Sequence, residues 1–385
     1  SSTAGATRIN LIFGRCFSQM TSQLFSPFDL GGLELPNRIV VSPMCQYAAT
    51  DGVPGPWHHA HLGQFAMSGP GLIFVEATGV EPNGRITPGC TGLYDDATEA
   101  AFAEIVTFIK SVGDSRVGIQ LSHAGRKGST SAPWEGGGLI EGAGGWTPEA
   151  PSVVPYLPGW PAPQEMDAAA LDRVKDAFAE SARRAGRAGF DVVEVHAAHG
   201  YLLHQFLSPI TNTRTDSYGG SLENRMRFPL EVFATVRAAF PADRPVILRL
   251  SATDWIEGGW DMEGSIAFTS ALKDLGCAAI DVSSGGLDQK QAIITGPGYQ
   301  VGFAETLRRE VGIPVIAVGQ ITDPVQAETI IATGQADLVA LARGMLWDPR
   351  WTWKAALALG AEISLPAPYA RCNPALAAKP FVTRT

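Results

Sequence analysis

The segment from His196 to His204 concentrates side chains that could do chemistry. It reads His-Ala-Ala-His-Gly-Tyr-Leu-Leu-His and follows a short apolar run that is typical of a strand. Two imidazole N–H groups, from His196 and His199, could polarise a substrate carbonyl if both were aimed at its oxygen. A phenol with an ordinary pKa of about 10 is protonated at neutral pH, so Tyr201 could donate a proton to a developing carbanion.

The same segment has two other interpretations. His-x-x-His spacing occurs in metal sites, but no His-Glu-x-x-His motif and no nearby carboxylate–cysteine set completes a ligand shell. A lone buried histidine is often just a hydrogen-bonded core residue. The purely structural interpretation is less favoured because other polar residues also lie at the ends of predicted strands. They are Cys45, Gln120, His123 and Arg249.

The elements that must position these side chains alternate between short β-branched runs and longer helical segments. Such alternation predicts a parallel sheet with crossover helices, and eight strands predict a single (β/α)₈ TIM barrel. In a barrel the carboxyl ends of all strands converge on one mouth, where active sites lie. The strand candidates are Arg38–Ser42, Gly71–Glu76, Arg116–Leu121, Asp191–Val195, Pro245–Leu250, Ala279–Ser283, Pro314–Val318 and Asp337–Leu341.

Two features lie between the third and fourth predicted strands. Apolar residues from Leu171 to Ala185 have helical spacing, with Asp167 as the expected N-cap and Gly189 as the end of the helix. Before this helix, residues 123–165 are rich in Gly, Pro and Trp and have no helical period. We expect this stretch to be a long excursion that covers the barrel mouth, because long ordered loops are usually functional.

Glycine-containing turns follow the last two predicted strands. Val318-Gly319 follows the seventh strand and Ala342-Arg343-Gly344 follows the eighth, which is where barrels often bind a phosphate. Backbone N–H groups and the Arg343 guanidinium could hold a phosphoryl group there. No Gly-x-Gly-x-x-Gly motif opens a helix after a strand, so a nicotinamide donor would have to visit the active site directly.

Composition narrows the class of protein. The chain has 385 residues and a formal net charge of −9, which disfavours a nucleic-acid partner. Its apolar runs fall short of the roughly 20 residues that a membrane-spanning helix needs. The five cysteines form no Cys-x-x-Cys pair, which indicates a reducing compartment, and we expect a cytoplasmic protein. We expect residues 1–23 to be a leader outside the fold and residues 24–385 to form one catalytic domain.

Five segments resemble the old yellow enzyme family, and the resemblance covers the chain from Leu24 onward. The Met-Cys-Gln-Tyr sequence is similar to the thermophilic-like bacterial branch that includes xenobiotic reductases. The segments are Pro36-Asn-Arg-Ile-Val-Val-Ser-Pro-Met-Cys-Gln-Tyr47, Gln120-Leu-Ser-His-Ala-Gly-Arg-Lys127, His196-Ala-Ala-His-Gly-Tyr-Leu202, Gly219-Gly-Ser-Leu-Glu-Asn-Arg225 and Leu341-Ala-Arg-Gly344.

This resemblance implies an FMN-dependent ene-reductase with a ping-pong scheme. NADPH would reduce non-covalently bound FMN, which would pass a hydride to the β-carbon of an α,β-unsaturated carbonyl or nitro compound. The implied FMN contacts are Pro43, Met44, Cys45, Ala77, Gln120, His196, Arg249, Ser284, Gly285, Val318, Gly319, Ala342, Arg343 and Gly344.

The resemblance also implies roles in substrate binding. Tyr47, His196 and His199 would hold the substrate oxygen, Tyr201 would protonate the α-carbon, and Cys45 would tune the flavin potential. Arg371 is similar to an arginine that this branch inserts into a neighbouring subunit, which implies a homodimer or homotetramer. The residues after it, Cys372-Asn373-Pro374, depart from the family's pattern.

Other functions remain open at this stage. A flavin-free, phosphate-binding isomerase or lyase could use the same fold, although lysines such as Lys273 lie on helical stretches rather than at strand ends. A dienoyl-CoA reductase would need a cysteine cluster and a further domain, and an idle flavin carrier would have no reason to keep these donors together. Arg126 and Lys127 could be ordinary surface charges or could contact NADPH.

Overall fold

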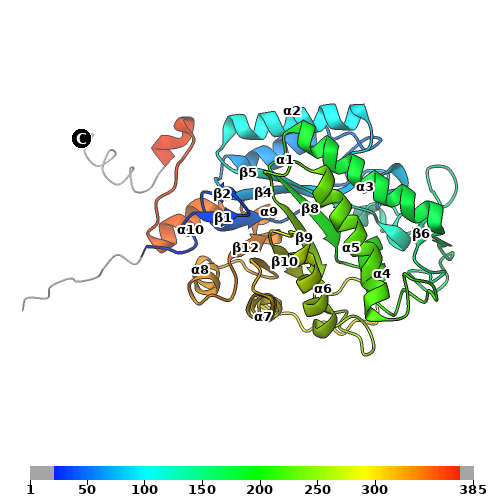
Figure 1. The fold of residues 1–385 in the computed structure, drawn as a ribbon. Coiled ribbons are helices and arrows are strands. Elements are labelled where there is room, and N and C mark those ends of the chain that lie inside the picture. Colours follow the sequence, from blue (N-terminus) through cyan, green and yellow to red (C-terminus); the bar gives the residue numbers. More distant parts are fainter. Residues whose placement is uncertain (1–20, 373–385) are drawn as a thin grey trace, which may run out of the picture.

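The computed structural model describes residues 21–372. Eight parallel strands form a closed barrel, and helices surround it (Figure 1). The barrel strands are β3 (Ile39–Val41), β4 (Leu72–Gly79), β5 (Arg116–Ser122), β8 (Val192–Ala197), β9 (Val246–Ser251), β10 (Ile280–Ser283), β11 (Val315–Val318) and β12 (Leu338–Leu341). All eight overlap the predicted strands, so the (β/α)₈ prediction is confirmed.

Helices follow the strands along the chain. The α-helices are α1 (Pro56–Ala66), α2 (Asp96–Val112), α3 (Ala168–Ala188), α4 (Leu202–Leu207), α5 (Leu222–Ala239), α6 (Met262–Asp274), α7 (Val301–Val311), α8 (Pro324–Ala332), α9 (Arg343–Trp347) and α10 (Trp351–Leu359). Short 3₁₀ turns are η1 (Pro82–Gly84), η2 (Gly125–Lys127), η3 (Pro133–Glu135) and η4 (Ala367–Cys372). No helix among the described residues is long and apolar enough to cross a bilayer.

The N-cap, the apolar face and the terminating glycine that predict helix α3 are all present in the structure. The Asp167 carboxylate accepts a hydrogen bond from the Ala170 backbone N–H, which caps the first turn. Gly189 ends the helix with a φ of 91°, a left-handed conformation that glycine adopts without strain. Leu171, Val174 and the rest of the predicted apolar face are buried against the barrel.

The amino-terminal end of the barrel is closed by a hairpin that we did not predict. Strands β1 (Phe28–Leu30) and β2 (Leu33–Leu35) pair antiparallel through a turn at Gly31 and Gly32, both with positive φ. Leu30 and Leu35 are fully buried among the lowest interior side chains of the barrel strands. The Leu-Gly-Gly-Leu sequence between alternating apolar residues is a hairpin signal that could have revealed this element.

The excursion after β5 lies at the opposite end of the barrel, as Figure 1 shows for β6. It contains η2, η3 and a small parallel sheet of β6 (Glu149–Ala150) and β7 (Gln164–Glu165).

The segment before the barrel is tied to α8. The Ser22 hydroxyl and the Gln23 backbone N–H donate hydrogen bonds to the Glu328 carboxylate. Residues 1–20 of the predicted leader lie outside the described residues, and the domain boundary at residue 24 stays a prediction.

Candidate active site

The floor of the site is a layer of polar side chains inside the barrel. Val40, Val192, Ile247 and Ala279 belong to a buried apolar cluster at the amino-terminal end. Side chains two residues apart in a strand share a face, so the interior positions next toward the mouth on these strands contain polar groups. These are Ser42, Glu194, Arg249 and Asp281, all buried.

The polar groups of this layer are linked across neighbouring strands. The Arg249 guanidinium donates a hydrogen bond to the Ser42 hydroxyl at 3.0 Å, and its Nε lies 3.5 Å from an Asp281 carboxylate oxygen. The Gln120 amide donates to the Glu194 carboxyl at 2.8 Å. Arg249 Nε and the second oxygen of Glu194 have no hydrogen-bond partner among the described residues. Both atoms could therefore form further hydrogen bonds.

His196, His199 and Tyr201 meet at the carboxyl end of β8. The His196 ring centroid lies 5.2 Å from that of His199 and 5.1 Å from that of Tyr201. The chain makes this approach by a sharp turn in which His199 has a φ of 58° and Gly200 a φ of 73°. A side chain at Gly200 would clash with the Gly286 carbonyl oxygen, so the turn packs tightly on the loop after β10.

Both imidazoles stay neutral. Burial lowers the pKa of His196 and of His199 well below the ordinary value, and the positive charge of Arg249 adds to this effect. The Ala198 backbone N–H approaches His196 Nδ1 at 3.4 Å, and His199 Nε2 lies 2.8 Å from the Ser283 hydroxyl. Each ring therefore has one nitrogen engaged by the protein and one left for a ligand.

Tyr201 carries its proton at neutral pH. Burial raises the pKa of this phenol well above 10, and the nearby Cys45 and Tyr47 groups act in the same direction. Tyr201 is also the N-cap residue of α4, so its backbone is fixed by the helix start. A protonated phenol beside two neutral imidazoles is the arrangement that proton donation next to a bound carbonyl requires.

Lys127 is a half-buried residue whose contacts the sequence did not reveal. Its ammonium donates hydrogen bonds to the backbone carbonyls of His199 and Gly286 at 2.8 and 3.0 Å. It also lies 4.9 Å from the centroid of the Tyr201 ring. Arg126 beside it is buried and donates to the carbonyls of Pro155 and Leu287. The interpretation of these two residues as surface charges was wrong.

Cys45 and Tyr47 lie on the loop after β3. Burial raises the pKa of the Cys45 thiol well above its usual range, so this sulfur stays protonated rather than acting as a thiolate. Burial also raises the pKa of Tyr47, and a hydrogen bond with Cys45 contributes to the shift. The Tyr47 ring stacks edge-on against Trp134 of η3 with centroids 5.7 Å apart, which brings the excursion over this loop.

The turns after β10, β11 and β12 provide the remaining predicted residues. Gly285 and Gly319 have φ values of 67° and 120°, which only glycine adopts easily. The Ser284 hydroxyl donates to the Gln300 side chain, which in turn donates to the Val318 carbonyl, so these turns are tied together. Arg343 is exposed at the start of α9 and has no ion-pair partner among the described residues.

Arg371 does not join this site within one chain. It is exposed in η4, which lies toward the hairpin end of the barrel rather than beside the excursion (Figure 1). Its predicted contact with a neighbouring subunit stays a prediction. Pro43 and Met44 follow β3, Ala77 lies near the carboxyl end of β4, and Ala342 follows β12, and their contacts with FMN stay predictions.

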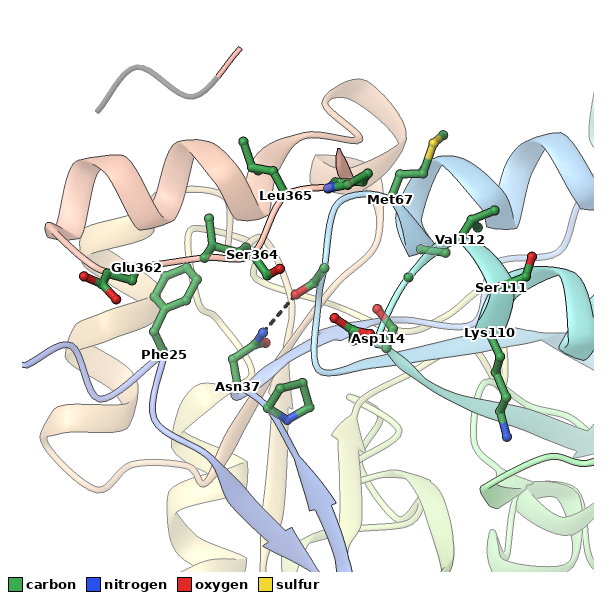
Figure 2. Close-up of a pocket in the computed structure, with 17 residues that line it drawn as sticks. Phe25, Asn37, Met67, Lys110, Ser111, Val112, Asp114, Glu362, Ser364 and Leu365 are labelled. Carbon is green, nitrogen blue, oxygen red and sulfur yellow. Dashed lines mark hydrogen bonds between the residues drawn. The ribbon is translucent and has the colours of Figure 1, made fainter. Parts of the chain in front are cut away.

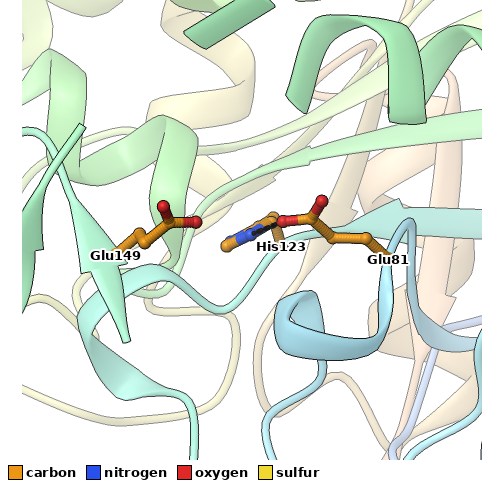
Figure 3. Close-up of side chains that lie close together, drawn as sticks. All are labelled: Glu81, His123 and Glu149. Atoms are coloured by element: carbon orange, nitrogen blue, oxygen red, sulfur yellow. Dashed lines mark hydrogen bonds and ion pairs between the residues drawn. The ribbon is translucent and has the colours of Figure 1, made fainter. Parts of the chain in front are cut away.

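His123 belongs to a separate cluster at the edge of the mouth. Its Nε2 lies 3.0 Å from the Glu81 carboxylate, and Figure 3 shows its ring between Glu81 and Glu149. The Gly125 backbone N–H donates to His123 Nδ1, and Arg173 pairs with both carboxylates. Burial opposes ionisation of Glu81, but His123 and Arg173 together hold its pKa at about 2. Both histidine nitrogens are occupied and Arg173 supplies the positive charge, so this cluster fits a structural brace for η2 better than a metal site.

A hollow at the other end of the barrel is not part of the site. It encloses about 330 Å³ between the end of α2, the residue Asn37 before β3 and residues 362–366 (Figure 2). Asn37 donates a hydrogen bond to the Gly69 carbonyl, and Lys110 pairs with Asp191. These polar groups are therefore satisfied by the protein, and His196 and Tyr201 are not among the lining residues.

Comparison with known proteins identifies the family. The sequence pattern of the NADH:flavin oxidoreductase / NADH oxidase family matches residues 23–362. The chain belongs to this family. The old yellow enzymes, which the sequence motifs resemble, belong to the same family. The resemblance is therefore confirmed.

Individual relatives agree with this membership. The chain is 44% identical to an NADPH dehydrogenase of Geobacillus thermodenitrificans, over 91% of this chain and 99% of the relative. It resembles the solved structure of morphinone reductase with a TM-score of 0.74 and 33% identity, over 91% of this chain and 93% of the other. It also resembles a 2-naphthoyl-CoA reductase, with a TM-score of 0.79 and 25% identity over 88% of this chain, and spans about half of that longer protein (52%).

The family establishes the cofactor and the class of enzyme. The chain is an oxidoreductase that uses FMN with NAD(P)H as the electron donor. The described residues fit this cofactor, because Arg249 Nε is buried without a hydrogen-bond partner. Gly344 lies within α9, where glycine costs about 1 kcal/mol relative to alanine, although no protein atom would clash with a Cβ there. A glycine without a structural reason fits a position that a ligand approaches closely.

Proposed function

We propose that the protein is an ene-reductase that reduces α,β-unsaturated carbonyl or nitro compounds with NADPH. FMN, when bound, would supply the hydride for the β-carbon of the alkene. The observation that supports this most strongly is that a neutral imidazole, His199, and a protonated phenol, Tyr201, have ring centroids 5.2 and 5.1 Å from that of the neutral His196. Neutral N–H donors polarise an oxygen without adding a titrating charge to the site.

The proposed FMN site lies between the polar floor and the glycine turns. Arg249 and Gln120 would contact the polar edge of the ring, and Arg343 with the N–H groups near Gly319 and Gly344 would hold the phosphate. Further contacts are proposed for Pro43, Met44, Cys45, Ala77, His196, Ser284, Gly285, Val318 and Ala342. The protonated Cys45 thiol would lie close to the ring and tune its potential as a polarisable neutral group.

Substrate would bind over the ring with its oxygen between His196 and His199. Tyr201 would protonate the α-carbon, and Tyr47 would contact the substrate from the loop after β3. Because the chain has no separate nucleotide-binding motif, NADPH and substrate would use this space in turn, in a ping-pong scheme. We also propose a cytoplasmic homodimer or homotetramer in which Arg371 approaches a neighbouring subunit.

The visible absorbance of the purified protein tests this proposal. We expect flavin bands that bleach with NADPH under anaerobic conditions and return when 2-cyclohexen-1-one is added. A protein that takes up FMN and is bleached, but is reoxidised only by oxygen, would contradict the alkene-reducing half of the proposal. A colourless protein that gains no bands when incubated with FMN would contradict the whole.

A further inference from the structure

Two carboxyl groups are buried beneath the proposed flavin site, and no proposed catalytic step uses them. Glu194 on β8 and Asp281 on β10 are 0% and 1% exposed. Strand β9 lies between β8 and β10 and carries Arg249. In the register of β9 and β10, Arg249 lies directly opposite Asp281. In barrels the side chains of one interior layer come from alternate strands, so Glu194 and Asp281 face the same interior space.

The hydrogen bonds available to this pair do not satisfy two ionised carboxylates. Gln120 donates to one Glu194 oxygen, and Arg249 Nε lies 3.5 Å from one Asp281 oxygen. The other Glu194 oxygen and both Asp281 oxygens are buried and have no hydrogen-bond partner among the described residues. A buried carboxylate without partners is costly, but a proton shared between the two groups converts two acceptors into a donor and an acceptor.

The charges favour placing that proton on Glu194. Asp281 lies beside the Arg249 guanidinium, whereas Glu194 receives its hydrogen bond from a neutral amide. Burial raises the pKa of Glu194 well above its ordinary value, and the negative charge of Asp281 adds to this. Burial also raises the pKa of Asp281, but the positive charge of Arg249 lowers it.

We propose that Glu194 is permanently protonated and donates to Asp281, whose single negative charge offsets Arg249 and thereby lowers the reduction potential of the bound flavin. This inference rests on the proposed FMN site. Reduction of a flavin adds negative charge to its ring, so an uncompensated Arg249 would favour the reduced form. Asp281 would act as a positioning residue, because it acts through Arg249 rather than by touching the flavin.

The decisive experiment measures the reduction potential of bound FMN in wild type and two variants. Asp281→Asn removes the charge and keeps the shape, and we expect a positive shift of at least ~30 mV, which is a tenfold change in a two-electron equilibrium. Glu194→Gln keeps a neutral hydrogen-bond donor, so we expect a shift several times smaller. An unchanged or more negative potential in Asp281→Asn, or an equal positive shift in both variants, would overturn the proposal.

Infrared spectroscopy of the wild-type protein keeps the proposal testable if a variant does not fold. At pH 8 we expect one protonated carboxyl band that moves when the protein carries ¹³C-labelled glutamate. No such band, or a band that moves only with labelled aspartate, would overturn the assignment of the proton. This measurement does not depend on FMN, so it separates failure of this inference from failure of the proposed function.

Discussion

The Ser283 hydroxyl lies 2.8 Å from His199 Nε2 at the mouth of the barrel. If the hydroxyl donates, His199 carries its proton on Nδ1, which leaves an N–H for the substrate. The tautomer of a histidine is set by the hydrogen bond that its other nitrogen makes. Ser283, which the sequence did not single out, would therefore determine whether His199 is a donor or an acceptor for the substrate oxygen.

Replacing Ser283 by alanine tests this relationship. We expect kcat/KM for enones to fall by about 2- to 13-fold in Ser283→Ala, because one net hydrogen bond of roughly 0.5–1.5 kcal/mol is lost or misdirected. The ¹⁵N shifts of His199 should then show a mixture of tautomers. Ser181→Ala is the matched control, since Ser181 is a buried residue of α3 that donates to the Leu93 carbonyl. Equal losses of kcat/KM in the two variants would contradict a specific role for Ser283.

Lys127 should matter for stability more than an exposed lysine does. Lys127→Met leaves the carbonyls of His199 and Gly286 without their buried donor, and each unsatisfied group costs about 1–3 kcal/mol. We expect the free energy of unfolding in urea to drop by about 2–4 kcal/mol. Lys110→Met, which removes a partly exposed ion pair with Asp191, should cost less than about 1 kcal/mol. Similar losses in both would show that the Lys127 contacts contribute little.

Arg343 should affect FMN affinity and leave the apoprotein unchanged. It is exposed and has no ion-pair partner among the described residues, so Arg343→Gln should not change the unfolding of the apoprotein. We expect the Kd for FMN to rise about 10- to 100-fold, as loss of a charge-assisted hydrogen bond of about 1.5–3 kcal/mol implies. The control Arg309→Gln removes an exposed arginine paired with Glu310, and it should leave the Kd within twofold. An unchanged Kd in Arg343→Gln would place the phosphate elsewhere.

The neutral histidines predict how stability depends on pH. The pKa values of His196 and His199 are lowered in the folded protein, so below about pH 6.5 the unfolded chain binds protons that the folded chain does not. Stability should therefore fall as pH drops below about 6.5. In His199→Asn the slope should be smaller by up to about 1.4 kcal/mol per pH unit at the acidic end of the range, because one titrating group is absent. Urea unfolding between pH 5.5 and 7.5 measures both slopes, and equal slopes would mean that folding does not lower the pKa of His199.

The barrel could be predicted from sequence because its signals are local. Each strand is a short apolar run, and Asp167 and Gly189 mark the ends of α3 through chemistry within a few residues. The strand-end residues His196, His199, Tyr201 and Arg249 followed from the rule that strand ends converge.

The supporting contacts could not be predicted in this way because they join distant parts of the chain. Lys127 reaches the carbonyl of Gly286, and Ser283 reaches His199, and neither pair has a local signature. Glu194 and Asp281 did leave a signal, since each is a charged residue flanked by apolar residues within a strand. A buried charge needs a partner, and that requirement could have directed attention to Arg249.

Rapid-mixing measurement of the two half-reactions in Tyr201→Phe tests the central claim most directly. We expect reduction of bound FMN by NADPH to stay within about twofold of wild type, since Tyr201 donates no proton in that step. Reoxidation by 2-cyclohexen-1-one should slow by at least ~10²-fold, the usual effect of losing a positioned acid. Reoxidation at the wild-type rate would contradict the assignment of Tyr201 as the proton donor.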